Sequence, residues 1–187
     1  ASSAASGHTE GELACEPKAL HVSPQALYIQ NLRFLREART RQGHRRYHAV
    51  SCALANPAES LSDTGAALSI ITSEALQATP VDAVIARDPN ATVEPLVGPN
   101  GQPLATRGTV DITFLLEGQP LRHTFVVVEG KPLIIFGNDF LSSRRASIHL
   151  NAYGEGNGYV ELHSESIHGR PLYHRASVSS SPRCRES

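Results

Sequence analysis

The sequence lacks several residue types on which other classes of protein depend. Tryptophan and methionine are absent and aromatic residues make up only 5% of the 187 residues, so a core must rest on Val, Ile, Leu and Ala. No apolar run approaches the roughly 18 to 20 residues of a membrane-spanning helix, and no charged-then-apolar leader opens the chain. We therefore expect a soluble protein with one β-rich core. Because methionine is missing even at the first position, we expect a processed product, part of a longer precursor or a recombinant product.

Charge and cysteine content exclude further classes of protein. The net charge is -1, so the molecule as a whole has no bulk field that would attract nucleic acid or an anionic membrane. Cys15, Cys52 and Cys184 are widely spaced and fit neither a disulfide framework nor a zinc cluster. The histidines show no metal-ligand spacing, and neither a phosphate-binding Gly-rich loop nor a Gly-x-Ser-x-Gly motif is present. We predict no metal, no cofactor, no membrane partner and an intracellular reducing compartment.

The two ends of the chain differ in composition from its middle. Residues 1–22 are rich in Ala, Ser, Gly and Glu without a usable period, and residues 166–187 end in a Ser-rich stretch. Such segments cannot bury enough apolar surface to fold alone, so we predict a flexible arm and a flexible tail.

Residues 23–44 predict a basic amphipathic helix and its linker. Ser23 can cap a helix, Pro24 suits its first position, and apolar residues recur at roughly helical spacing to about residue 41. The helix and its exit carry six arginines against the single acid Glu37. They are Arg33, Arg36, Arg39, Arg41, Arg45 and Arg46. Two interpretations stay open: a basic surface for RNA, DNA or an acidic partner, and an ordinary solvated helix face.

Residues 45–165 predict one all-β unit, because short apolar runs alternate there with turn residues. The expected strands span about 47–53, 68–72, 83–86, 92–96, 109–116, 122–128, 133–136, 146–150 and 158–163. No repeat of the length used by solenoids or propellers is present.

The candidate site begins with the run Asp63-Thr64-Gly65-Ala66, set between apolar runs, and continues with Leu133–Leu141, of sequence LIIFGNDFL. An acid in a tight Thr-Gly turn, followed later by an apolar-apolar-Gly segment that enters a short helix, resembles the retropepsin-like aspartic proteases of retroviruses and retrotransposons. The resemblance covers roughly residues 45–165. It implies a closed small barrel with one short C-terminal helix, here preceded by the predicted N-terminal helix.

The chemistry of peptide hydrolysis indicates that one chain would supply half of a site. Two carboxyl groups must share a proton, so that one activates water while the other protonates the carbonyl oxygen. Among the five aspartates only Asp63 is followed by Thr-Gly or Ser-Gly. We therefore expect a homodimeric endopeptidase in which the Asp63 residues of two chains meet on a two-fold axis.

The resemblance also assigns roles to the neighbours of the acid. Thr64 would hydrogen-bond across the two-fold axis, Gly65 would let the backbone approach the carboxylates, and Ala66 would leave room for the peptide substrate.

Two later segments complete the predicted site. Gly98, Asn100 and Gly101 lie at an expected hairpin tip, where these proteases carry a flap over the substrate. By the same resemblance Ile135 and Gly137 support the catalytic loop from behind. Asp139, or Asn138 beside it, is expected to cap a short helix that runs to about residue 145, which makes Asp139 structural rather than a second catalytic acid.

Two departures from the family pattern favour an alternative. Ser62 stands where an apolar residue normally packs under the acid, and Ala67 replaces a frequent hydroxyl residue. The alternative is a catalytically inactive retropepsin-like scaffold, bound through its basic helix and tails in a larger assembly with or without RNA.

Overall fold

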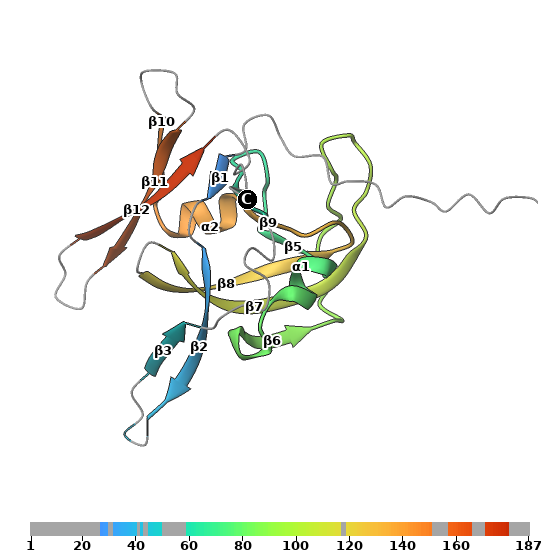
Figure 1. The fold of residues 1–187 in the computed structure, drawn as a ribbon. Helices are drawn as coiled ribbons and strands as arrows, with labels where there is room; N and C mark the ends of the chain where they lie inside the picture. The colour runs from blue at the N-terminus through green and yellow to red at the C-terminus, as the bar shows by residue number, and fades with distance from the viewer. Residues whose placement is uncertain are drawn as a thin grey trace, which may run out of the picture.

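The computed structural model describes residues 27–29, 32–40, 42, 45–49, 59–116, 119–150, 157–165 and 171–179. The arm predicted for residues 1–22 and all three cysteines lie outside these residues. The described chain is mostly β, with two short helices and one 3₁₀ turn (Figure 1). The elements are β1 Leu27–Ile29, β2 Arg33–Arg39, β3 Arg45–Ala49, β4 Glu59–Ser62, β5 Ile70–Thr72, α1 Ser73–Ala78, η1 Val81–Ala83, β6 Val84–Asp88, β7 Thr106–Leu116, β8 Gln119–Val128, β9 Leu133–Phe136, α2 Asn138–Ser143, β10 Ser147–Leu150, β11 Asn157–Glu165 and β12 Pro171–Ser179.

All twelve strands belong to one large mixed sheet. Its order is β10-β11-β12-β1-β4-β9-β5-β8-β7-β2-β3, and β6 pairs with β7 beside this path. The outermost strands, β10 and β3, do not pair with each other in the described part of the chain, so the sheet is open. The predicted closed barrel is therefore wrong. A barrel closes only when its first and last strands pair, and here extra strands lengthen the sheet at both ends instead.

Three neighbouring strands, β4, β9 and β5, form the centre of the sheet. β9 pairs parallel with β4 and antiparallel with β5, so it lies between two strands that the acid turn connects. All four residues of β9 are buried, which is typical of a strand with both faces covered. The residues that follow β9 therefore emerge directly beside the turn that carries Asp63.

The hydrophobic core lies on both sides of this centre. The larger cluster contains Phe114, Phe136 and Phe140, with the Phe136 and Phe140 ring centroids 4.8 Å apart. The smaller cluster contains Leu61 and Ile135 together with residues of β5, β8 and β9. Apolar side chains packed on both sides of the sheet hold β4, β9 and β5 in place beneath the acid turn.

The helix predicted for residues 24–41 is wrong, because β1 and β2 occupy that region. β1 pairs with β4 and β12, and β2 pairs with β7 and β3, so distant strands satisfy the backbone hydrogen bonds that a helix would have formed locally. Aromatic and β-branched residues such as Tyr28, Ile29 and Phe34 favour these extended segments. Burial of Ile29 and Phe34 in the larger core cluster outweighs a weak helical period.

The predicted flexible tail also differs from the structure within residues 171–179. β12 pairs with β11 from Asn157 to Glu165 and with β1. Ala176 and Val178 of β12 are buried in the larger core cluster. The sheet thus continues past the predicted end of the β unit at residue 165.

Several predictions of individual strands are confirmed. β3 and β5 to β11 overlap eight of the nine expected segments, and residues 92–96 form no named strand. No helix in the described part of the chain is both long and apolar enough to cross a bilayer.

Candidate active site at the acid turn

Asp63 directly follows β4 at the start of a tight turn. Its backbone N–H donates to the carbonyl of Phe136 over 3.0 Å, and its carbonyl accepts from the N–H of Ala66 over 3.2 Å. The carboxylate oxygen Oδ1 accepts from the N–H of Gly65 over 2.8 Å. Asp63 is 5% exposed, whereas Thr64 and Gly65 are exposed. The turn therefore aims its exposed residues outward and keeps the acid oriented from within.

The residues that follow β9, from Gly137 into the start of α2, hold this turn from behind. The N–H of Asn138 donates to the carbonyl of Ala66 over 2.8 Å, and that of Asp139 donates to the carbonyl of Ala67 over 3.2 Å. The side-chain amide of Asn138 donates to the backbone carbonyl of Thr64 over 2.8 Å. One segment thus satisfies three carbonyl groups of the turn. Ile135, also predicted as support, pairs with β4 and β5 on either side of it.

Gly137 permits the close approach that these hydrogen bonds need. A Cβ at this position would lie 2.5 Å from the carbonyl oxygen of Leu68 and 2.9 Å from that of Ala66. Both neighbours are backbone atoms, so neither can rotate away as a side chain could. The backbone of Gly137 has φ -89°, which any residue can adopt, so glycine is required here for space alone.

A polar cluster lies beneath the turn, and the sequence carries no signal for it. The hydroxyl of Ser69 donates to Oδ1 of Asp139 over 2.7 Å and accepts from the N–H of Gly137 over 3.1 Å. Nε2 of His123 lies 3.0 Å from the Ser69 hydroxyl oxygen and 3.1 Å from Oδ2 of Asp139. The residues come from the end of the acid turn, from β8 and from α2, so the cluster ties three distant segments together.

These three residue types occur in serine hydrolases, but their arrangement here does not fit that chemistry. The same nitrogen of His123 faces both Ser69 and Asp139, whereas a relay needs opposite ring nitrogens for the nucleophile and the acid. Ser69 is also 0% exposed and cannot meet a substrate. The cluster is therefore structural.

Asp139 is ionised over a wide pH range in this environment. Burial raises its pKa, but hydrogen bonds from His123, from the hydroxyl and backbone of Ser69 and from the backbone of Phe140 outweigh burial and lower the pKa to about 2. The helix cap differs from the prediction. Gly137 occupies the N-cap position, and Asp139 lies within the first turn, where its carboxylate accepts from the N–H of Phe140 over 2.7 Å.

The hairpin tip predicted as a flap is present. Val97 and Pro103 form an isolated bridge, the N–H of Gly98 donates to the carbonyl of Gln102 over 2.7 Å, and that of Gly101 donates to the carbonyl of Gly98 over 2.9 Å. Gly101 has φ +74°, a left-handed conformation that favours glycine. The side chain of Asn100 accepts from the N–H of Gln102 over 3.1 Å.

The arms of this hairpin lie near the acid turn. Leu96 and Leu104 pack against the smaller core cluster, and so do Ala66 and Leu68 of the turn. The hydrogen bonds that shape the hairpin tip run from one hairpin residue to another. The turn and the hairpin arms thus pack against the same apolar cluster, while hydrogen bonds within the hairpin hold its tip.

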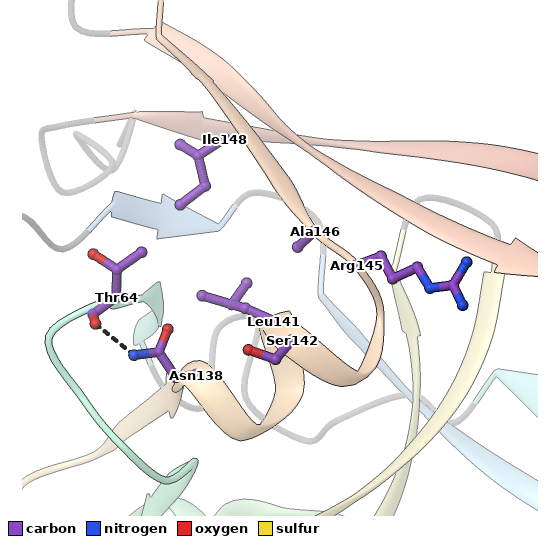
Figure 2. Close-up of a pocket in the computed structure, with 7 residues that line it drawn as sticks. All are labelled: Thr64, Asn138, Leu141, Ser142, Arg145, Ala146 and Ile148. Carbon is purple, nitrogen blue, oxygen red and sulfur yellow. Dashed lines mark hydrogen bonds between the residues drawn. The ribbon is translucent and has the colours of Figure 1, made fainter.

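A pocket of about 170 Å³ lies beside the turn. Figure 2 shows Thr64 and Asn138 joined by their hydrogen bond beside the pocket, with Leu141 and Ile148 opposite them. The lining residues are Thr64, Asn138, Leu141, Ser142, Arg145, Ala146 and Ile148. Apart from Thr64 and Asn138, the sequence alone assigns these residues no part in a site.

The unusual Ser62 is buried just before the acid. It is 1% exposed, and its hydroxyl oxygen has no hydrogen-bond partner among the described residues. A buried hydroxyl without a partner costs about 1 to 3 kcal/mol of stability. The chain therefore keeps an unfavourable polar group at the position where the resembled family packs an apolar one.

No cluster of three or more His, Cys, Asp and Glu side chains suited to a metal ion occurs in the part of the chain that is described. The chain matches no protein-family model, and no curated protein matches it.

Proposed function

We propose that this chain is one half of an aspartic endopeptidase that hydrolyses extended peptides as a homodimer. The observation that carries the proposal is the position of Asp63 in a turn that four backbone or side-chain hydrogen bonds hold against Phe136, Asn138 and Asp139. A carboxylate must be oriented before it can activate water, and this turn orients it without help from a substrate.

The remaining aspartates support the need for a second chain. Asp139 is engaged by Ser69 and His123, and Asp111 is bound by Arg122 and by the hydroxyl of Thr124, which lies 2.6 Å from its Oδ1. Burial raises the pKa of Asp111, but the bonds from Thr124 and Arg122 outweigh it and lower the pKa. Carboxylates that stay ionised in ion pairs are poor partners for sharing a proton.

The other two aspartates are engaged at the surface. Asp82 lies 3.8 Å from a guanidinium nitrogen of Arg36, and Asp88 accepts from the N–H of Asn90 over 3.0 Å. A twin Asp63 from a second chain is therefore the simplest source of the second carboxyl group. Two identical turns related by a two-fold axis bring their exposed Thr64 and Gly65 residues together and keep both acids at the junction.

In the proposed mechanism one Asp63 is ionised and its twin is protonated. The ionised carboxylate takes a proton from water as the oxygen of that water attacks the peptide carbonyl carbon, and the protonated twin donates its proton to the carbonyl oxygen. As the tetrahedral intermediate collapses, the Asp63 that took the water proton donates it to the nitrogen, and a hydroxyl of the intermediate returns a proton to the twin carboxylate. The C–N bond breaks to give a carboxylic acid and an amine, and the pair again holds one proton. The hairpin around Gly98 and Gly101 would cover an extended substrate.

The test is cleavage of an unstructured peptide library by the full chain over a range of mildly acidic pH, with Asp63→Asn as the variant. Asp88→Asn is the matched control, because it makes the same change at an exposed turn. We expect cleavage by the wild type and the control, no cleavage by Asp63→Asn, and specific activity that rises with protein concentration as the dimer forms. Unchanged turnover in Asp63→Asn would reject the mechanism.

The inactive scaffold is the second candidate, and the 5% exposure of Asp63 favours it, since a covered carboxylate cannot reach water or substrate in a single chain. It requires a chain that stays monomeric at every concentration and cleaves nothing in the library. Sedimentation of the same samples measures the mass and separates the two candidates.

A further inference from the structure

His123 lies among aromatic rings on β8, and the proposed mechanism gives it no part. Its ring centroid lies 5.3 Å from that of Phe125 and 5.2 Å from that of Phe140, both in an edge-on arrangement. Its side chain is 15% exposed. A polar ring that is largely removed from water destabilises a fold unless its nitrogen atoms are hydrogen-bonded. The hydrogen bonds of His123 therefore decide what this residue contributes.

The neighbours of Nε2 of His123 determine where the hydrogen of the ring lies. Asp139, whose pKa is lowered to about 2, is ionised, so its Oδ2, 3.1 Å from Nε2, can only accept. The Ser69 hydroxyl donates its single hydrogen to Oδ1 of Asp139, so its oxygen, 3.0 Å from Nε2, must also accept. Two acceptors beside one nitrogen require that Nε2 carries a hydrogen. His123 is thus a donor to both side chains, whether its ring is neutral or charged.

The two side chains that His123 holds belong to segments that fix the acid turn. The Ser69 hydroxyl oxygen accepts from the N–H of Gly137 over 3.1 Å. The N–H of Asp139 donates to the carbonyl of Ala67 over 3.2 Å. Hydrogen bonds therefore continue from the histidine through these side chains to the backbone of the turn that carries the acid.

Packing alone does not explain a histidine at position 123. A phenylalanine ring would lie beside Phe125 and Phe140 without burying a polar atom. Histidine instead supplies a hydrogen to a carboxylate and to a hydroxyl. Ser69 is 0% exposed, so water cannot replace this donor at its hydroxyl oxygen. The donor at Nε2 is therefore the property of His123 that the surrounding residues use.

We propose that His123 is a positioning residue for peptide cleavage: its Nε2–H group fixes Ser69 and Asp139, and these in turn fix the orientation of Asp63. This inference rests on the proposed function. Loss of the Nε2 donor should displace the acid but leave the hairpin over the substrate in place, because hydrogen bonds within the hairpin hold its tip. We therefore expect kcat to fall and KM to change little. A displacement of about 1 Å can lower a rate by about 100-fold.

The experiment compares two amide side chains at position 123 of the full chain. The amide nitrogen of glutamine lies as many bonds from Cα as Nε2 of histidine does, whereas that of asparagine corresponds to Nδ1. His123→Gln should keep most of the wild-type kcat, and His123→Asn should lower kcat by roughly 10- to 100-fold. His123→Phe keeps the ring packing without the donor and should resemble His123→Asn. The matched control is His149→Asn, which removes a histidine whose Nε2 lies 3.0 Å from Oε2 of Glu161, and it should cleave as the wild type does.

NMR of isotope-labelled protein supplies readouts that do not depend on cleavage. The imidazole spectrum of the wild type should place the hydrogen of the neutral His123 ring on Nε2. The amide of Gly65 donates to Oδ1 of Asp63 over 2.8 Å, so its chemical shift reports the orientation of the acid. This shift should move in His123→Asn, return toward the wild-type value in His123→Gln and stay unchanged in His149→Asn.

Three results would overturn the inference: a neutral His123 ring with its hydrogen on Nδ1, equal kcat in the two amide variants, or an unmoved Gly65 signal in folded His123→Asn. If His123 only stabilised the fold, the unfolding temperature would fall while kcat per folded chain stayed the same. Should His123→Asn not fold, His123→Phe and the wild-type imidazole spectrum decide. If the wild type cleaves nothing, the proposed function fails, and the Gly65 signal alone decides whether His123 orients the acid.

Discussion

Gly137→Ala tests whether the acid turn depends on the close approach of the segment between β9 and α2. The added Cβ would lie 2.5 Å from the carbonyl oxygen of Leu68, whereas ordinary contact begins at 3.4 Å. Since the obstacle is backbone, the two segments must separate. The hydrogen bond from Asn138 N–H to the Ala66 carbonyl, now 2.8 Å, would then exceed the range of a good hydrogen bond.

Separation weakens three hydrogen bonds together: the bonds from the N–H groups of Asn138, Asp139 and Gly137 to the turn and to Ser69. At about 1 kcal/mol each, their loss lowers the free energy of unfolding by about 3 kcal/mol. Denaturation in urea, followed by circular dichroism, measures this change. The same turn orients Asp63, so peptide cleavage by any folded Gly137→Ala protein should fall as well.

Gly101→Ala is the matched control for this variant. Gly101 has φ +74° and no atom within 4 Å of an added Cβ, so alanine there brings backbone strain without a clash. That strain costs about 1 kcal/mol. Gly137, with φ -89°, has the reverse combination of a clash without strain. If Gly137→Ala loses no more stability than Gly101→Ala, the acid turn does not need glycine for close approach, and the three hydrogen bonds do not depend on it.

Two further predictions concern buried polar groups. Ser62→Ala should raise the free energy of unfolding by about 1 kcal/mol in urea titrations, because it removes a buried hydroxyl with no partner among the described residues. Thr79→Val should lower it, because the Thr79 hydroxyl donates to the carbonyl of Ala75 over 2.8 Å; a loss of stability in both variants would contradict the prediction for Ser62. The depressed pKa of Asp139 contributes about 2 kcal/mol of stability that is present above pH 4 and lost as the pH falls through about 2. Asp139→Asn should therefore reduce the loss of unfolding free energy between about pH 4 and pH 2. An unchanged loss over this range would exclude Asp139 as its source.

The sequence predicted best those features that short segments determine. The acid turn and the Asn-Gly hairpin tip each depend on residue types with a strong local preference, and both are in the structure. β7 and β8, which overlap two of the expected strands, pair as a hairpin of neighbouring segments, although their burial alternates only in part, since Phe125–Val128 are all buried.

Features that depend on distant partners were missed. The spacing of Leu27, Leu32 and Leu35 suits a helix, but pairing of β1 with β4 and β12 and of β2 with β7 and β3 makes that region extended. Whether the sheet closes depends on whether its two outermost strands pair, and no local sequence pattern indicates this. The contact of His123 with Ser69 and Asp139 joins three segments far apart in the chain, so a lone histidine in a strand was no guide to it.

One chain can orient Asp63 by itself, whereas the proposed catalysis needs a second chain. Asp63 and its neighbours are held by hydrogen bonds from their own chain, so the orientation of the acid should not depend on protein concentration. On the proposed mechanism the second carboxyl group comes from another molecule, so activity must depend on concentration steeply below the dimer dissociation constant. A structural signal from the turn, such as the chemical shift of the Gly65 amide, should therefore persist at dilutions where cleavage per chain has already fallen. If the two disappear together, the turn needs its twin to form, and the hydrogen bonds within one chain are too weak to hold it.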